Sequence, residues 1–409
     1  MIMANRHIVF LQGMPSPFFS RIACKLTKLG CKTTGINLCI GDWIFWNGAN
    51  TVNYRGNYLD WPTFIARFFD ETQVTDIVLL GEQRRYHKQA VEIAQHKGIR
   101  VIVSDYGYLR PDWITLERDG MSGNSKFPKL PEKIAELASL VPKADFSLKY
   151  NDSDYNMSIG DLIYSFSNVF LFWLYPHYRR SDRRPNPIIY FPAIGIRLIK
   201  TKVNKSKAYL RMYALLKEMP RYFLFPLQLE HDFQIVAYSP FDDMESAIKM
   251  VIKSFSDNAE KDTRLMIKIH PWDPGLKNWK NKIFQLAKEF SVCERIDYFD
   301  GGSLDEMIKG SLGMITVNST SGIRSLQHGI PVKTLGDAIY NIQGITYQNP
   351  LDKFWTDRLK PDSKLVNDLL NAMAGTIQIR GVFFSEQGLN AAVEQAVDRI
   401  YNSTVGIPL

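Results

Sequence analysis

Cysteine is scarce in this sequence of 409 residues, with four copies at positions 24, 31, 39 and 293. None of them forms a CxxC pair and no histidine stands near them in sequence. This spacing argues against a disulfide framework or a structural zinc site and favours a reducing cytoplasmic compartment. We expect no secretory leader, because the apolar run at residues 8–11 is shorter than the ~7–15 residues of a signal peptide.

Signatures of common cofactor sites are also missing. The sequence has neither GxGxxG nor GxxxxGK followed by Ser or Thr, which excludes the dinucleotide fingerprint and the P-loop. It has no HExxH zinc motif either. The tripeptide Asp152-Ser153-Asp154 has the DxD form of metal-dependent glycosyltransferases, but it follows a polar stretch instead of an apolar strand. We interpret it as a loop and predict no metal site.

Long apolar runs are absent too. A membrane-spanning helix needs about 20 apolar residues, whereas residues 162–176 (LIYSFSNVFLFWLYP) are fewer, contain polar side chains and stop at Pro176. A buried core helix is the simpler interpretation. The alternative is a helix at a membrane interface, with the arginines that follow meeting anionic headgroups. These arginines are Arg179, Arg180, Arg183 and Arg184.

The composition is that of a folded protein with a basic surplus. Apolar residues make up 45% of the chain and aromatic residues 12%, which excludes intrinsic disorder. The length predicts two to three domains at roughly 150 residues each. The net charge of +8 favours anionic partners. Nucleic acid is not expected among them, because the basic residues are dispersed and no recognition module is visible.

Short apolar runs alternate with helical patterns in two parts of the chain. Strands are predicted at residues 7–11, 32–37, 76–81, 100–103, 222–225, 264–269, 313–317 and 332–335. Helices are predicted at residues 18–29, 85–97, 244–254, 279–290 and 323–328, and residues 363–401 look helical throughout. Such alternation indicates βαβ units and parallel sheets.

We therefore predict an α/β protein that is GT-B-like, with two doubly wound Rossmann-type domains facing across a cleft and helices at the C-terminus. The predicted domains are an acceptor and catalytic domain at 1–130, a helical connecting region at 131–220, a nucleotide-sugar domain at 221–350 and C-terminal helices at 351–409. Epimerases and binding proteins share this architecture, so the fold alone does not give the function.

Polar residues follow the predicted strands of the second half, where ligands bind in open α/β sheets. His270 and Pro271 end one strand, and the imidazole can donate to a phosphate oxygen or simply sit in a turn. Hydroxyls and free amides at a helix start make an anion site, although ordinary N-capping is the alternative. The residues of this second element are Asn318, Ser319, Thr320, Ser321 and Gly322.

A third group in this half, Gln228, Asp232 and Gln234, follows residues 222–225. Their amide and carboxylate groups suit a sugar or a base edge, or are equally well solvated loop residues.

In the first half, Asp105 and Arg110 follow the strand at residues 100–103. Asp105 can serve as a nucleophile or base and Arg110 as a clamp for a carboxylate or phosphate. The alternative is a plain salt bridge between them. Arg84 and Arg85 add positive charge at the same edge of the predicted sheet.

Eight stretches carry a family resemblance. In chain order, from residue 11 to about 344, they are LQGMPSPFF, GEQRRYH, GYLRPDWITLE, FPLQLEHDFQ, YSPF, KIHPWDPG, TVNSTSG and LGDAIYNIQG. In these stretches the sequence resembles the KpsS/LipB capsule polysaccharide proteins of Gram-negative bacteria. The resemblance implies a cytoplasmic enzyme, peripheral on the inner membrane, that works with other capsule synthesis and export proteins. It implies a retaining β-Kdo transferase that moves the first Kdo from CMP-Kdo to lysophosphatidylglycerol, an anionic phospholipid, with no metal cofactor.

The resemblance also implies roles for particular residues. His270, Pro271 and residues 319–321 would hold the CMP phosphate, as similar elements do in CMP-sialic-acid transferases. Asp105 would act on the sugar, with Glu117 as the reserve candidate. Gly13, in the first matching stretch, is predicted to lie with the arginines near substrate.

Two positions depart from the family pattern. Family members commonly have two acids before the glycine of GYLRPDW, and here Tyr106 stands in the second place. Tyr238 stands where a histidine is common. These departures favour an alternative, a non-catalytic export or assembly component that binds glycolipid. A further alternative is a metal-independent transferase with another nucleotide sugar.

Overall fold

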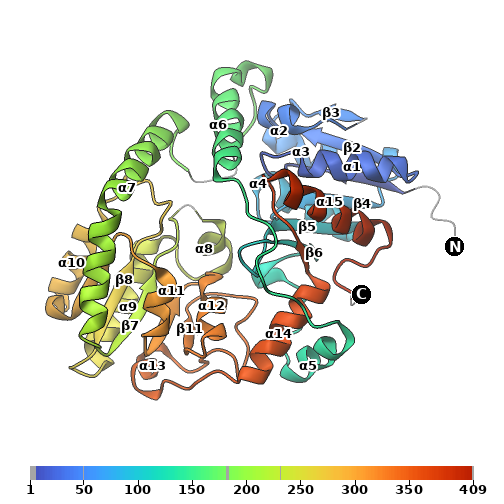
Figure 1. The fold of residues 1–409 in the computed structure, drawn as a ribbon. Coiled ribbons are helices and arrows are strands. Elements are labelled where there is room, and N and C mark those ends of the chain that lie inside the picture. The colour runs from blue at the N-terminus through green and yellow to red at the C-terminus, as the bar shows by residue number, and fades with distance from the viewer. Residues whose placement is uncertain (1–5, 49, 181–183, 231, 408–409) are drawn as a thin grey trace. The chain divides into compact units, whose positions relative to one another are not determined.

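The computed structural model describes residues 6–48, 50–180, 184–230 and 232–407 (Figure 1). The chain forms two compact units. Unit 1 contains Met1–Phe127, Leu137–Asp182 and Leu370–Leu409, and unit 2 contains Pro128–Glu136 and Arg183–Leu369. The region expected to connect two domains is thus shared between the units, and the end of the chain belongs to unit 1.

Unit 1 is built on a seven-stranded sheet with the order β12-β6-β5-β4-β1-β2-β3. The strands are β1 (His7–Phe10), β2 (Lys32–Asn37), β3 (Thr51–Asn53), β4 (Asp76–Leu80), β5 (Arg100–Tyr106), β6 (Trp113–Arg118) and β12 (Gln378–Arg380). Strands β1 to β5 are parallel, and every residue of β1 and β4 is buried. Both faces of the sheet are therefore covered, which is why these strands read as unbroken apolar runs.

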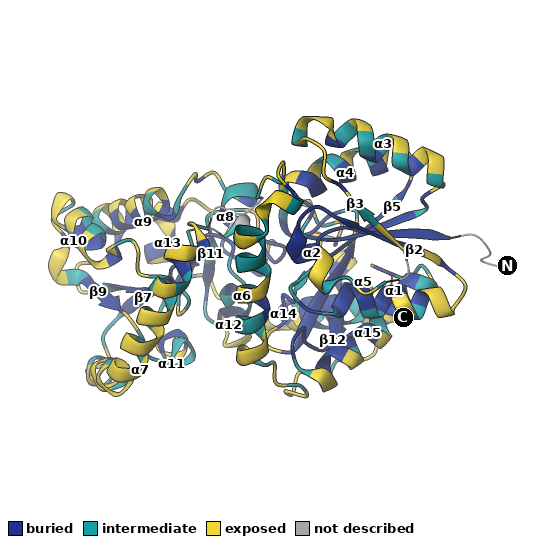
Figure 2. Cartoon of the chain, turned by 90° about the horizontal axis from the view of Figure 1, so that it is seen from above, coloured by how far each residue is buried: buried dark blue, intermediate teal, exposed yellow. Residues whose placement is uncertain are grey.

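Helices lie on both faces of this sheet. They are α1 (Phe18–Lys28), α2 (Ile40–Phe45), α3 (Trp61–Thr72), α4 (Arg85–His96), α6 (Asp154–Phe170) and α15 (Glu386–Tyr401), with 3-10 turns η1 (Tyr58–Asp60), η2 (Ser122–Asn124) and η3 (Phe172–Leu174). Figure 2 shows α3 and α4 on one side of the strands and α1 and α15 on the other. Ile22 of α1 and Val393 of α15 share one core with Ile8 and Ile102 of the sheet. Helices α5 (Pro131–Leu140) and α14 (Ser363–Thr376) cross the boundary between the units.

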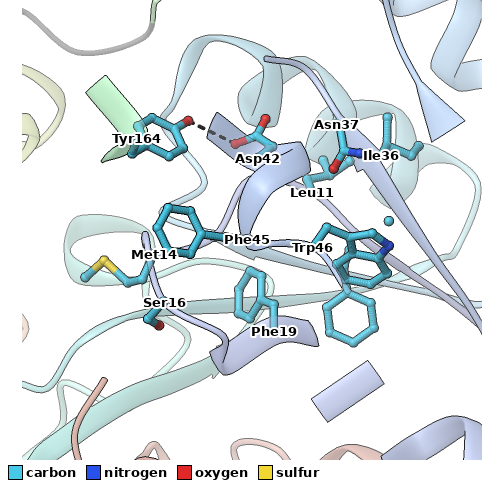
Figure 3. Close-up of a pocket in the computed structure, with 13 residues that line it drawn as sticks. Leu11, Met14, Ser16, Phe19, Ile36, Asn37, Asp42, Phe45, Trp46 and Tyr164 are labelled. Carbon is cyan, nitrogen blue, oxygen red and sulfur yellow. Dashed lines mark hydrogen bonds between the residues drawn. The ribbon is translucent and has the colours of Figure 1, made fainter. Parts of the chain in front are cut away.

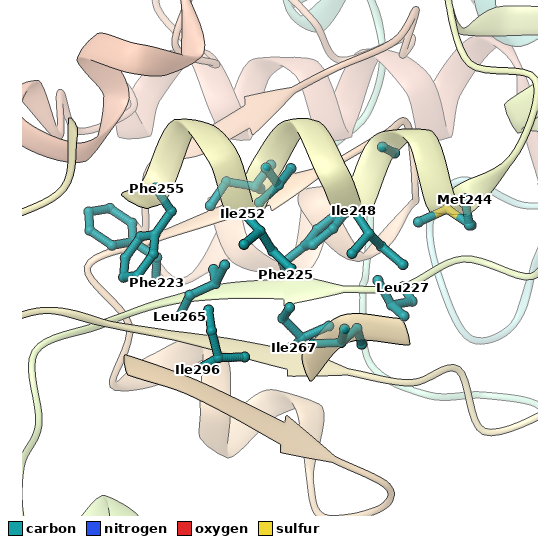
Figure 4. Close-up of a cluster of buried hydrophobic side chains, with 14 of the residues drawn as sticks. Phe223, Phe225, Leu227, Met244, Ile248, Ile252, Phe255, Leu265, Ile267 and Ile296 are labelled. Carbon is teal, nitrogen blue, oxygen red and sulfur yellow. The ribbon is translucent and has the colours of Figure 1, made fainter. Parts of the chain in front are cut away.

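Unit 2 has a five-stranded sheet, all parallel, with the order β11-β10-β7-β8-β9. The strands are β7 (Tyr222–Pro226), β8 (Arg264–Lys268), β9 (Ile296–Phe299), β10 (Gly313–Thr316) and β11 (Val332–Thr334). The helices and turns are α7 (Pro187–Lys217), α8 (Phe233–Tyr238), α9 (Met244–Asn258), α10 (Trp279–Glu289), η4 (Cys293–Arg295), α11 (Leu304–Lys309), α12 (Ser321–Gln327) and α13 (Leu351–Asp357). Figure 4 shows Ile248, Ile252 and Phe255 of α9 packed on Phe225 and Leu265 of the sheet.

The two sheets share one topology. In chain order, the parallel strands of unit 1 run 3-2-1-4-5, and those of unit 2 repeat this order as β9-β8-β7-β10-β11. This is the start of the doubly wound order, in which the chain reverses direction next to the first strand. The predicted class of two doubly wound α/β units is confirmed. The reversal places the carboxyl ends of β1 and β4, and of β7 and β10, at the positions where such sheets bind ligands.

The prediction of a helical C-terminal tail is wrong in one place. Between α14 and α15 the chain forms β12, which pairs antiparallel with β6. The strand is three residues long, and Gln378, Ile379 and Arg380 are all buried. A strand this short leaves no periodicity in the sequence, and it exists because β6 offers it an open edge. The strand predicted at 100–103 is also longer, since β5 continues to Tyr106 and turns back into β6.

The prediction that residues 162–176 form a buried core helix is wrong as well. One face of α6 packs on unit 1, where Asn168 accepts a hydrogen bond from the Gly41 amide and Gly160 lies against the Pro15 carbonyl. Its other face and the following 3-10 turn are open to solvent, with Phe170, Phe172 and Trp173 about 60% exposed. The sequence did not distinguish these faces because both carry large apolar residues. Arg183, one of the four arginines in the interfacial alternative, lies outside the described residues.

Within the described parts of the chain, none of the helices combines the length and the apolarity that crossing a bilayer requires.

Candidate functional site

Asp105 lies at the end of β5 and is half-buried. Its Oδ1 accepts a hydrogen bond from the Tyr106 amide at 2.7 Å. Its Oδ2 lies 3.6 Å from the point where a methyl group on Gly81 would be, and Arg84 Nε lies 3.9 Å from the same point. Gly81 has a φ of +58° and no side chain, so the Asp105 carboxylate and Arg84 both lie close to its backbone.

Charge and burial act on this carboxylate in opposite directions. Burial raises the pKa of Asp105, while Arg84 and then Arg110 oppose the rise. Arg110 itself is exposed, and its guanidinium lies 4.8 Å from the centre of the Tyr106 ring. The two arginines therefore favour the ionised form that a nucleophile or a base requires.

Tyr106 occupies the opposite face of the sheet from Asp105, because successive residues of a strand alternate. Its ring packs edge-on against Phe383 at 5.3 Å, and its hydroxyl lies 3.5 Å from the sulfur of Met157. The tyrosine thus fills the core of unit 1, and the acid at the strand end is Asp105 alone.

Glu117, the reserve candidate, is 1% exposed and held in a buried network. The Tyr108 hydroxyl donates to its Oε1 at 2.6 Å, and the Ser125 hydroxyl donates to its Oε2. Burial raises the pKa of Glu117 to about 8, and the nearby charge of Glu82 adds to the rise. With both oxygens engaged and no solvent access, Glu117 is placed to order the β5–β6 hairpin.

The raised pKa of Glu117 predicts a pH-dependent stability. In the unfolded chain this carboxyl ionises near pH 4.5 and in the fold near pH 8, so unfolding releases a proton between these values. The glutamate's contribution to stability is present below about pH 4.5 and is lost as the pH rises to about 8. We expect Glu117→Gln to gain stability relative to the parent protein over this range, by a few kcal/mol in total.

Denaturant titrations of both proteins at pH 5, 6.5 and 8 measure this difference. Comparing the two proteins cancels the titration of His87, which is buried and has its pKa lowered to about 3 by burial and by Arg84. Parallel stability curves for the two proteins would mean that Glu117 is ionised in the fold.

Of the remaining basic candidates in unit 1, Arg84 is the N-cap of α4 and lies beside Asp105. Arg85 begins that helix, is exposed and stacks its guanidinium over Tyr58 at 5.4 Å. The structure therefore brings Arg84 and Arg110 to Asp105 and gives Arg85 a partner of its own.

Gly13 lines a small pocket at the carboxyl ends of β1 and β2 (Figure 3). A methyl group on Gly13 would lie 2.7 Å from the Phe19 ring, so glycine permits this close packing. The space for solvent is about 30 Å³, which admits about two water molecules and no sugar ring.

Asp42, a buried acid that the sequence analysis did not single out, also lines this pocket. It accepts hydrogen bonds from the Tyr164 hydroxyl at 2.9 Å and from the Gln12 amide at 3.0 Å, and burial raises its pKa. Tyr164 belongs to α6 and Gln12 follows β1, so the acid ties α6 to the first strand. No motif in the sequence reveals it.

In unit 2, Gln228 and Asn318 meet across the point where the strand order reverses. Gln228 Nε2 donates to Asn318 Oδ1 at 2.9 Å, and the Asn318 amide donates to Gln228 Oε1 at 3.0 Å. Asn318 Nδ2 also donates to the backbone carbonyl of Tyr238. Both side chains are buried. These hydrogen bonds join the segments that follow β7 and β10.

Residues 319–322 form a tight turn that starts α12. The amide of Ser321 donates to Ser319 Oγ, and the amides of Gly322 and Ile323 donate to the carbonyls of Ser319 and Thr320. The prediction of free amides is therefore wrong for Ser321 and Gly322, because the turn uses them internally. Hydroxyls remain: Ser319 Oγ accepts from both the amide and the hydroxyl of Ser321, so its own hydrogen can be donated to a further acceptor.

Gly322 has a packing reason to be glycine. A methyl group there would lie 2.3 Å from the hydroxyl of Tyr340, which donates to the Ser319 carbonyl. Tyr340 thus holds the turn through the carbonyl of Ser319.

His270 follows β8 in a rigid loop. Its Nδ1 accepts a hydrogen bond from the Trp272 amide at 3.1 Å, so the neutral ring carries its hydrogen on Nε2. Asp273 holds the loop by accepting from the Gly275 amide at 2.8 Å and from the Trp279 indole at 3.0 Å. Pro271 is exposed between them.

Lys268 was not among the candidates. It lies two residues before His270, on the last residue of β8, and is 5% exposed. Burial lowers its pKa, with Asp300 opposing and Arg197 adding to the shift. The sequence signal that could have identified Lys268 was the alternation of side chains along a strand, which places Lys268 and His270 on the same face.

Other predicted residues are less informative. The Asp232 amide donates to the Leu229 carbonyl at the start of α8, and the side chain of Gln234 lies outside the described residues. Asp152 of the DxD accepts hydrogen bonds from the amides of Phe384 and Ser385. This acid anchors the C-terminal segment. Among the described residues, no three His, Cys, Asp or Glu side chains are arranged to hold a metal ion.

Residues 75–384 match the family described as capsule polysaccharide biosynthesis protein. The chain is 30% identical to the capsule polysaccharide export protein KpsS of Escherichia coli, over 94% of this chain and 98% of that protein. It is 31% identical to the capsule polysaccharide modification protein LipB of Neisseria meningitidis serogroup A, over 93% and 92%. Among solved structures, KpsC of Thermosulfurimonas dismutans, a β-Kdo 2,7 transferase, aligns over 97% of this chain and 99% of that chain at 14% identity and a TM-score of 0.48.

Proposed function

The chain belongs to the capsule polysaccharide biosynthesis protein family, and we propose that within it this protein is a retaining β-Kdo transferase. In the proposed reaction, CMP-Kdo gives the first Kdo to lysophosphatidylglycerol, which starts the lipid linker of the capsule. The observation that carries the proposal is the half-buried carboxylate of Asp105, which lies beside Gly81 and Arg84 at the end of β5.

Asp105 has the chemistry for a two-step displacement. Its Oδ2 attacks the anomeric carbon of Kdo while the bond from that carbon to the CMP phosphate oxygen breaks, and CMP leaves with the electron pair. The acceptor hydroxyl then attacks the same carbon, loses its proton and displaces Asp105. Two inversions retain the configuration, which is why a carboxylate nucleophile fits this reaction.

The nucleotide is assigned to unit 2. The Nε2 hydrogen of His270 and the hydroxyl of Ser319 are donors suited to a single phosphate. CMP carries only one phosphate, so two or three such donors are sufficient and the proposed reaction uses no metal ion. Pro271 and Thr320 are the sequence neighbours of these donors, and we include them with Asp232 in the proposed donor site.

Replacing His270 by alanine is expected to weaken CMP binding by about tenfold, the effect of one lost hydrogen bond to a charged group. Calorimetric titration of CMP into both proteins measures it. His270→Asn is the control for the loop, because an amide can still accept from the Trp272 backbone. Unchanged binding in the alanine variant would remove His270 from the donor site.

The acceptor and its setting complete the proposal. An anionic lysophospholipid fits the basic surplus of the chain, and its lipid tail places the protein at the cytoplasmic face of the inner membrane, with other capsule synthesis and export proteins as partners. Nucleic acid has no part in it.

The test is direct. Purified protein is incubated with CMP-Kdo and lysophosphatidylglycerol, and the lipid is analysed by mass spectrometry. A gain of one Kdo unit is the expected result. A folded protein with intact CMP-Kdo and no product would contradict the proposal.

Tyr106 favours the second candidate, a non-catalytic export or assembly component, because the position where relatives have an acid is filled here by a core aromatic. Turnover of CMP-Kdo would exclude it. A screen of other nucleotide sugars distinguishes the third candidate, a transferase with a different donor.

A further inference from the structure

Helix α7 is 31 residues long and carries charge of one sign only. It contains no aspartate or glutamate. Its seven basic residues are Arg197, Lys200, Lys202, Lys205, Lys207, Arg211 and Lys217.

One face of α7 is fixed to unit 2. Arg197 forms an ion pair with Asp300, and Arg211 lies 5.2 Å from the centre of the Phe299 ring. Met212 is fully buried, with its sulfur 3.0 Å from the point where a methyl group on Gly302 would lie. These contacts hold the helix on the segment that follows β9.

Much of α7 is exposed (Figure 2), and its exposed residues include large apolar side chains. Five of its side chains are 54 to 77% exposed: Ile188, Ile196, Ile199, Val203 and Leu210. At about 100° per residue these positions fall within one quarter of the helix circumference, and we call them the outer stripe. A helix packed only on its own core has a polar outer face, so an apolar outer stripe marks a surface that meets something else.

Lysines border the outer stripe on both sides. By the same helical geometry, Lys200 and Lys207 lie along one edge and Lys202 along the other, and all three are exposed. An apolar strip with cations along its edges matches the boundary between acyl chains and anionic headgroups. A second copy of this chain would bring like charges together.

We propose that α7 lies flat in the headgroup region of an anionic bilayer, with the outer stripe in the acyl boundary and the lysines on phosphate groups. This role is independent of the membrane-interface interpretation of residues 162–184. Arg197 Cδ lies 3.5 Å from the point where a methyl group on Gly275 would be, so α7 also contacts the loop that carries His270. Only the inference from this contact, that a lipid acceptor would lie near the loop of His270, rests on the proposed function.

Sedimentation of the full chain with vesicles tests the proposal. We expect binding to vesicles of phosphatidylglycerol and phosphatidylcholine, weakened by added NaCl, and little binding to pure phosphatidylcholine. Lys200→Glu with Lys207→Glu should reduce binding by at least about 25-fold, taking about fivefold for each lysine. Ile199→Ser with Val203→Ser should reduce it by at least about tenfold.

Matched controls lie elsewhere on the surface. Lys280→Glu with Lys288→Glu makes the same charge change on α10 of unit 2, and Leu59→Ser with Leu359→Ser removes two other exposed apolar side chains. Both controls should bind vesicles as the parent does. Equal losses in the α7 variants and the controls would overturn the proposal.

The proposal would also be overturned if the parent protein did not bind anionic vesicles and instead formed a dimer, and if Ile199→Ser with Val203→Ser abolished that dimer. Vesicle binding is measured without donor, so it stands or falls separately from turnover of CMP-Kdo.

Discussion

Replacing Asp105 by asparagine is expected to lower the turnover of CMP-Kdo by about a thousandfold or more, because the amide cannot form the covalent intermediate. Binding of CMP should stay within about twofold, since the change removes no donor to the phosphate. The asparagine keeps the size of the side chain and its acceptor for the Tyr106 amide. Mass spectrometry of the lipid product and calorimetry with CMP give the two readouts.

Asp119→Asn is the matched control. Asp119 follows β6, has a φ of +66° that asparagine also tolerates, and pairs with the neighbouring Arg118. It should retain parental turnover. Full activity of Asp105→Asn would remove the nucleophile assignment, and loss of CMP binding by the same variant would make Asp105 a binding residue.

The acid limb of the pH profile gives a further readout of the same residue. Because burial raises the pKa of Asp105 despite the arginines, the ionised form should be lost at a higher pH than for an ordinary aspartate.

Replacing Arg380 by alanine is expected to destabilise unit 1 by about 3–5 kcal/mol, the cost of leaving a buried charge without its partner. Arg380 Nε donates to Asp112 Oδ2 at 2.9 Å, and the side chains of the pair are 10% and 1% exposed. Its other nitrogens donate to the carbonyls of Asp145 and Ser147, and its guanidinium lies 4.6 Å from the Trp113 ring centre. One side chain thus joins β12, the β5–β6 hairpin and the segment before α6.

Urea denaturation measures the loss. Arg380→Lys should recover part of the stability, because it restores the charge but not the planar group of donors. Lys364→Ala serves as the control, since its ion pair with Asp368 is an exposed pair within α14 and is worth at most about 0.5 kcal/mol. Similar losses for Arg380→Ala and Lys364→Ala would show that the buried pair contributes little.

Sequence patterns revealed some residues of the candidate site and missed others. The predicted strand ends at Asp105, His270 and Asn318 were found because buried parallel strands are unbroken apolar runs, and polar residues at their ends stand out. Asp42 and Lys268 were missed because burial, not residue type, distinguishes them. The hydrogen bonds of the amides of residues 321–323 were missed because the backbone geometry of the turn, and not the residue types, decides which acceptors these amides reach.

The sequence by itself determined the class of this protein. The alternation of short apolar runs with helices specified two α/β units, and the ordered motifs specified the capsule polysaccharide family. Such features are local, since each depends on a few neighbouring residues.

Only the tertiary structure decided the features that depend on distant partners. Strand β12 exists because β6 has a free edge, and Glu117 holds its proton because the fold buries it, against the hydrogen bonds from Tyr108 and Ser125. The outer faces of α6 and α7 were also decided by the tertiary structure, because the sequence does not show which side of a helix the rest of the chain covers. Which apolar face stays in water is settled by what the rest of the chain covers.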